Sequence, residues 1–101
     1  MNLIDIKKLL ESTGYPVAYR CFAEKIKPPF ICYLSPYSRN FSADSKTYVK
    51  IDHIQIELYT EKKDQSAEGK VENALSSLFW QKTEEFIKDE KMYQIIYEIE
   101  V

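Results

Sequence analysis

Glycine is scarce in this chain of 101 residues, with only Gly14 and Gly69 present. A phosphate-binding loop needs several glycines at fixed spacing, so the sequence excludes a nucleotide-binding loop of that kind. Histidine occurs once, as His53, and cysteine twice, as Cys21 and Cys32. These three residues do not have the spacing of zinc ligands. We therefore expect neither a metal nor an organic cofactor.

An excess of charge of one sign is also missing, since 14 basic and 16 acidic residues give a net charge of −2. Nucleic-acid binding needs a concentrated cationic surface, so we expect no sequence-specific nucleic-acid partner. No apolar run approaches the roughly 20 residues of a membrane span, and charges interrupt the apolar residues of the amino-terminal segment. We expect no membrane partner and synthesis in the cytosol with reduced cysteines, although a Cys21–Cys32 disulfide remains an alternative.

What the chain does contain is the composition of one globular domain, 45% hydrophobic and 30% charged. Apolar periodicity predicts helices over residues 2–13 and 65–79, and strands over residues 17–22, 30–35, 46–60, 82–88 and 91–101. The order is α-β-β-β-α-β-β, with hairpins at both ends. It predicts a single α+β domain over residues 1–101, with two helices packed on one face of a mainly antiparallel sheet.

Local signals support both helices. Asn2 and Asp64 are suitable N-caps, and Gly14 suits a left-handed exit from the first helix. The expected core stripe of the second helix consists of Val71, Ala74, Leu75, Leu78 and Phe79.

The strand over residues 46–60 changes the face that carries its apolar residues. Val49 and Ile51 have one parity, and Ile54, Ile56 and Leu58 have the other. Because a strand exchanges its buried face only at a bulge, a twist or a change of packing partner, we expect one of two features near Asp52 and His53. Either the strand is irregular there, or its outer portion serves a different surface from its inner portion.

His53 is the residue that first suggests catalysis. Adjacent residues of a strand point to opposite faces, so Asp52 is poorly placed to orient the imidazole of His53. A catalytic histidine would need another carboxylate and a nucleophile, and no nucleophile-elbow pattern surrounds Ser42, Ser45 or Thr47. We expect His53 to be a surface or subunit-contact residue and no enzymatic activity, with a small enzyme that uses His53 as the alternative.

Residues 36–45 combine turn formers with aromatic side chains, and we expect an irregular loop there. Tyr37 and Phe41 do not fit a core pattern, and Arg39 lies between them. Aromatic and arginine side chains are those that anchor protein interfaces, so this loop is a candidate contact surface. The alternative is that it folds back and closes the core.

Charge is distributed unevenly along the chain. Residues 19–63 hold eight basic and five acidic residues, whereas residues 64–101 hold four basic and nine acidic residues. This polarity suits head-to-tail association of identical copies.

Five segments carry a family resemblance along nearly the whole chain: GYPVAYRCF, PPFICYLSP, NFSADSKTYVKIDHIQIELYTEKKD, VENAL and KMYQIIYEIEV. In this order they resemble the small minor structural proteins of tailed phages and Gram-positive prophages, of the tail-completion or tail-terminator type. Such proteins are encoded between the head–tail connector genes and the gene of the major tail protein.

The resemblance implies a non-enzymatic protein that forms a ring, often a hexamer, caps the tail tube and joins it to the head. Its implied partners are further copies of itself, the major tail tube protein and head–tail connector proteins. It would reside in the host cytoplasm during assembly and then in the tail or neck of the virion. Another neck or head-closure adaptor, or a standalone binding module, is the alternative. From residue type we select these contact residues: Tyr37, Arg39, Phe41, Asp44, Tyr48 and His53.

Overall fold

The computed structural model describes the backbone of residues 1–43 and 47–101 and the side chains outside residues 41–49. Within these ranges the elements are α1 (Leu3–Glu11), β1 (Val17–Tyr19), β2 (Phe30–Ala43), β3 (Thr47–Thr60), α2 (Gln65–Ala74), β4 (Gln81–Ile87) and β5 (Met92–Glu100). The predicted α+β class and element order are confirmed.

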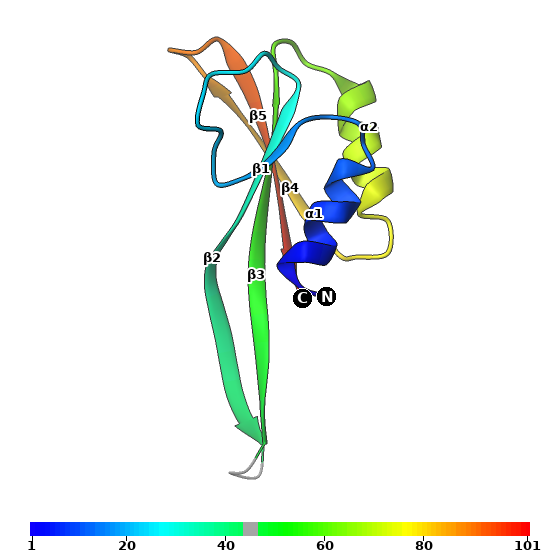
Figure 1. The fold of residues 1–101 in the computed structure, drawn as a ribbon, viewed down its shortest axis with the longest axis vertical. Helices are drawn as coiled ribbons and strands as arrows, with labels where there is room; N and C mark the ends of the chain where they lie inside the picture. The colour runs from blue at the N-terminus through cyan, green and yellow to red at the C-terminus, as the bar shows by residue number, and fades with distance from the viewer. Residues whose placement is uncertain (44–46) are drawn as a thin grey trace.

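The strands form one sheet in the order β1-β2-β3-β5-β4 (Figure 1). The short β1 runs parallel to β2, and the other neighbouring pairs are antiparallel. β5 therefore returns between β3 and β4, which places the last strand of the chain near the centre of the sheet.

A single core cluster joins both helices to the sheet. Its helical residues are Ile6 and Leu10 of α1, Ala67 and Val71 of α2, and Leu75 at the C-cap of α2. On the strands they are Ile31, Tyr33, Ile54, Ile56, Leu58, Ile95, Tyr97 and Ile99. The strand residues alternate along β2, β3 and β5, as expected where one side of a sheet is buried. We call the side that carries them the core face, and the opposite side of the sheet the outer face.

The predicted ends of the helices are confirmed at three positions. The amide of Asp5 donates to Asn2 Oδ1 (2.9 Å), and that of Ala67 donates to Asp64 Oδ1 (3.0 Å), so both caps satisfy otherwise unpaired amide groups. Gly14 has a φ of 87°, the left-handed conformation that glycine adopts at low cost.

The prediction for the end of the second helix is wrong. α2 ends at Ala74, and the amides of Leu75 and Ser76 close its last turn. The chain then has to turn toward β4, so Phe79 does not join the core stripe: its side chain is 99% exposed, whereas Leu78 still packs partly against the core.

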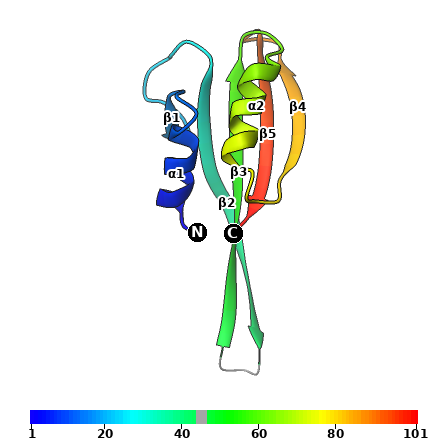
Figure 2. The same ribbon diagram turned by 90° about the vertical axis from the view of Figure 1, so that its right-hand side faces the viewer.

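The predicted loop over residues 36–45 is also wrong in its described part. β2 continues to Ala43 and pairs with β3 in register from Tyr37↔His53 to Ala43↔Thr47. The turn-forming residues stay extended because a partner strand supplies their hydrogen bonds, and Pro36 falls where the register shifts. We call residues 38–43 and 47–51 the arm. It projects from one end of the body (Figures 1 and 2), in a molecule that measures 50 × 26 × 23 Å.

The change of apolar parity in β3 coincides with the base of the arm. β3 itself stays regular, but β2 carries a register shift between Leu34 and Tyr37, opposite Ile54. The expected irregularity therefore lies in the partner strand. The backbone of Asp52 still pairs with Val101, but from Ile51 toward Thr47 the sole neighbour of β3 among the described residues is β2. Ile51 therefore lies outside the core.

No helix in the described ranges has the length and apolar character needed to cross a bilayer.

Candidate assembly surface

Aromatic and charged side chains gather on the outer face where the arm leaves the body. The rings of Tyr37 and His53 stack with centroids 4.6 Å apart and planes 8° from parallel. One edge of the imidazole is held by Glu98, whose Oε1 lies 3.2 Å from Nε2. The Tyr37 side chain remains 52% exposed, so the stack presents an aromatic surface to solvent.

Polar contacts fix the base of the arm on both sides. Arg39 forms an ion pair with Glu100, which ties β2 of the arm across β3 to the end of β5. Ser38 donates a hydrogen bond to Asp52, and this bond, supported by nearby Lys50, lowers the pKa of the Asp52 carboxyl. These contacts set the direction in which the arm leaves the sheet.

The structure brings three of the six predicted contact residues together, namely Tyr37, Arg39 and His53. The other three lie in or beside the part of the arm with no described side chains. Phe41 and Tyr48 occupy register positions opposite Val49 and Ser42, but their side chains are outside the described set. Asp44 lies outside the described residues altogether.

The surroundings of His53 also bear on the enzymatic alternative. Asp52 bonds to Ser38 and Lys50 rather than to the imidazole, as strand alternation predicts, and the carboxylate that does face the ring is Glu98. The hydroxyl of Ser35 donates to the main-chain oxygen of His53, not to its ring, while Nδ1 is buried without a partner among the described residues.

Phe79 is a surface residue that the sequence reasoning missed. The segment between α2 and β4, which carries Phe79, lies at the end of the body from which the arm projects (Figure 1), and Phe79 lines a shallow depression with His53, Trp80, Gln81, Ile99, Glu98 and Glu100. We call this set the root surface. Two adjacent serines, Ser76 and Ser77, were the available signal, because serine favours helix ends over helix interiors.

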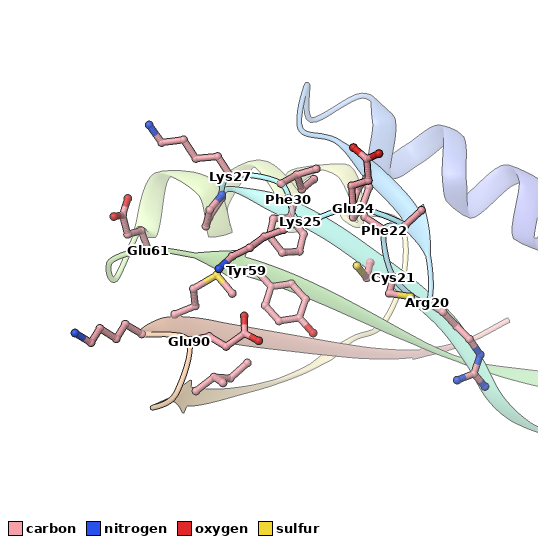
Figure 3. A pocket seen from close by; sticks show the side chains of 17 residues that line it. Arg20, Cys21, Phe22, Glu24, Lys25, Lys27, Phe30, Tyr59, Glu61 and Glu90 are labelled. Carbon is pink, nitrogen blue, oxygen red and sulfur yellow. The ribbon is translucent and has the colours of Figure 1, made fainter.

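A hollow of about 680 Å³ opens at the other end of the outer face (Figure 3). Residues 20–28 and the β4–β5 turn form its walls, and its floor is aromatic. Phe22 meets Phe30 edge to face at 5.5 Å, and Phe30 stacks on Tyr59 at 4.8 Å. The Tyr59 hydroxyl is held by Glu57 (2.9 Å) and by the amide of a neighbouring glutamine, so this floor is rigidly positioned.

Both cysteines line the hollow in the thiol form. Cys21 is exposed on its wall, whereas Cys32 is buried in its floor. Burial, with a smaller contribution from the Glu57 carboxylate, raises the pKa of Cys32 to about 11.

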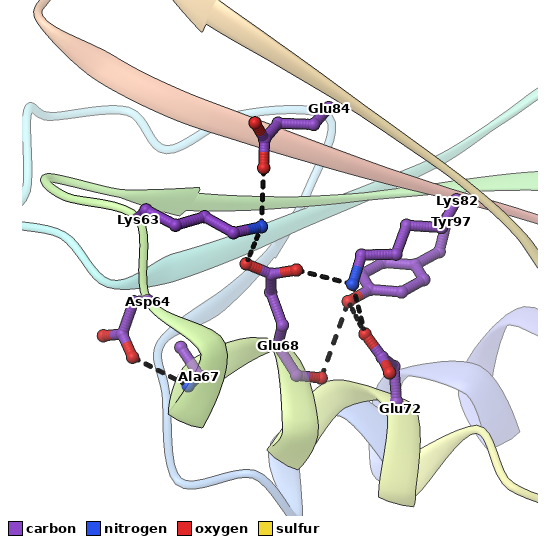
Figure 4. Close-up of polar contacts among 8 residues, drawn as sticks. All are labelled: Lys63, Asp64, Ala67, Glu68, Glu72, Lys82, Glu84 and Tyr97. Carbon is purple, nitrogen blue, oxygen red and sulfur yellow. Dashed lines mark hydrogen bonds and ion pairs between the residues drawn. The ribbon is translucent and has the colours of Figure 1, made fainter.

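An ion-pair network on the core face ties α2 to β4 (Figure 4). Glu68, only 3% exposed, receives the ammonium groups of Lys63 (2.7 Å) and Lys82 (2.5 Å). Lys82 also contacts Glu72 (2.8 Å), which accepts a hydrogen bond from the Tyr97 hydroxyl (2.8 Å). Burial alone would raise the pKa of Glu68, but the bonds from the two lysines outweigh it and hold that pKa below its usual value. The network fixes the edge strand that follows Phe79.

The described residues contain no cluster of three or more side chains suited to hold a metal ion. No known protein-family model matches the chain, and no curated protein matches it either.

Proposed function

We propose that this chain is a non-enzymatic structural component of a phage or prophage tail, which assembles as a ring, caps the tail tube and joins it to the head. The sequence resemblance supplies the biological setting. The observation that carries the proposal is the arm, a two-stranded extension that leaves the body and has no other described element of its own chain against it.

A two-stranded hairpin is marginally stable alone in water, because it buries little surface and leaves both edges unpaired. A neighbouring copy in a ring provides the missing contacts, and unpaired strand edges are a common device for joining subunits. Tyr37 and Arg39 lie where the arm begins, so the residue types that anchor interfaces stand at the expected place.

We further infer that both helices pack on one face of the sheet, which leaves the outer face for neighbouring proteins. The core cluster supports this arrangement because residues of both helices meet the same alternating set of strand residues. The arm base and the hollow lie on strand residues of the opposite parity, whereas the root surface includes Ile99 of the core cluster and lies at the end of the sheet. The implied partners are other copies of the chain, the major tail tube protein and connector proteins, first in the host cytoplasm and then in the virion neck or tail.

The test mixes the purified chain with polymerising tail tube protein and measures tube lengths by negative-stain microscopy. We expect shorter tubes with a ring at one end. Arg39→Glu places two acidic groups against each other at the arm base and should abolish capping. Lys7→Glu makes the same charge change on the exposed side of α1 and should leave capping intact. Tubes of unchanged length with the wild-type chain would refute the proposal.

A head-closure adaptor at the neck would use the same arm, and gene order separates the two functions. A gene immediately upstream of the major tail protein gene favours termination.

A further inference from the structure

We infer that Phe79 of one copy inserts into the hollow of the next copy, so that the arm end of each body docks on the opposite end of its neighbour. This inference rests on the proposed self-assembly and names the two surfaces that would meet. Phe79 is 99% exposed, although the segment that carries it is held at both ends.

The segment that carries Phe79 is well anchored. Leu75 belongs to the buried core just before it, and Trp80 just after it packs edge to face on Tyr97 at 5.5 Å. An anchored, fully exposed aromatic ring loses little conformational freedom when it is covered, which is a property of interface anchors. Single exposed apolar residues are common on protein surfaces, so an exposed ring marks a docking contact only where a complementary receptor surface exists.

The hollow has the chemistry of such a receptor. Its floor of Phe22, Phe30 and Tyr59 offers both ring faces and ring edges, and aromatic rings pair favourably in offset and edge-to-face arrangements. Its volume of about 680 Å³ exceeds that of one ring, which leaves room for side chains that flank Phe79.

Charge favours the same pairing. Of the charged residues that line the hollow, four are basic and three are acidic, for a net charge of +1. The root surface carries Glu98 and Glu100, and even with the cation of Arg39 counted its net charge is −1. Surfaces of opposite sign attract each other and fix the orientation of docking.

The two surfaces also have the required positions. The segment between α2 and β4 lies at the arm end of the sheet, and residues 20–28 lie at the other end (Figure 1). A contact between two different surfaces of one chain is heterologous, so it repeats from copy to copy and closes into a ring when the rotation allows.

Crosslinking tests the pairing directly, because Cys21 already lines the hollow and is exposed. In the Phe79→Cys variant, held at a concentration about a hundredfold above that at which the wild-type chain associates so that the lost ring is offset, a short bismaleimide should join the new thiol of one copy to Cys21 of the next and produce a ladder of covalent oligomers. Phe86→Cys, at a half-exposed phenylalanine on the core side of β4, is the matched control and should give no ladder. Adding Cys21→Ser to Phe79→Cys should remove the ladder.

A second measurement uses no crosslinker. Phe79→Ala should weaken self-association, measured by sedimentation, by about ten- to a hundredfold, because it removes an anchor residue. Phe86→Ala should change it by less than about threefold, and neither change should alter the far-ultraviolet circular dichroism.

The outcomes separate this inference from the proposed function. If the wild-type chain caps tubes but Phe79→Ala assembles normally and Phe79→Cys gives no ladder, the inference is wrong and the capping function stands. A dimer that persists in the Phe79→Cys, Cys21→Ser variant would show two root surfaces facing each other, which also overturns it. A wild-type chain that neither self-associates nor caps tubes defeats both.

Discussion

Replacing Glu68 by glutamine tests the network between α2 and β4. The side chain of Glu68 is 4% exposed, so its charge depends on the two ammonium groups that reach it. The Lys63 side chain is 43% exposed, and because exposed ion pairs contribute little, we assign its contact no share of the stability. Lys82 is about two-thirds covered and forms the second, better shielded contact.

A hydrogen bond to a charged group contributes about 1.5–3 kcal/mol, and Lys82 keeps Glu72 as a partner after the change. We therefore expect Glu68→Gln to lower the free energy of unfolding by about 2 kcal/mol. For a domain of this size that is a fall in Tm of roughly 8–16 °C, measurable by circular dichroism. Glu84→Gln removes an exposed partner of the same Lys63 and should cost less than about 0.5 kcal/mol.

The effect should depend on pH with a definite sign. The folded pKa of Glu68 is lowered, so its contribution is fully present above the ordinary glutamate value of about 4.5 and is lost as pH falls through the folded value. The difference in stability between wild type and Glu68→Gln should therefore shrink below about pH 4. An equal difference at pH 7 and pH 3, or a larger loss for Glu84→Gln, would refute the reasoning.

Three further predictions concern single side chains. Tyr97→Phe removes the hydroxyl bonded to Glu72 and should lower the free energy of unfolding, measured with denaturant, by about 1 kcal/mol; an unchanged free energy would contradict a stabilising role for this bond. Ile56→Ala, at a fully buried site, should cost about 2–5 kcal/mol in the same assay, and a loss below 1 kcal/mol would contradict the described core. At pH 8 a thiol reagent should modify Cys21 rapidly and Cys32 only slowly, since burial raises the pKa of Cys32 to about 11; equal rates would contradict its burial.

The fold was predictable from sequence where local signals and tertiary packing agree. Asn2 and Asp64 cap the helices as expected, and the alternation of Ile54, Ile56 and Leu58 marks the core side of β3. These residues act through short-range hydrogen bonds or through a period that a single sequence displays.

The errors lie where a distant segment decides the structure. Ser, Asn and Pro in residues 36–43 favour turns by themselves, but pairing with β3 keeps them extended. Phe79 continues the helical period of Val71 and Leu75, yet the chain must leave the helix after Ala74 to reach β4. The pair formed by His53 and Glu98 joins residues 45 positions apart, and no local pattern announces it.

The central claim is that the arm is a contact between subunits, and hydrogen exchange tests it most directly. In the free chain, amides of residues 38–43 and 47–51 should exchange far faster than those of β3 and β5 that pair inside the body. In the assembled state, exchange in the arm should slow by more than about tenfold, while that of exposed α1 amides stays unchanged. An assembly that forms while the arm exchanges as it does in the free chain would contradict the account.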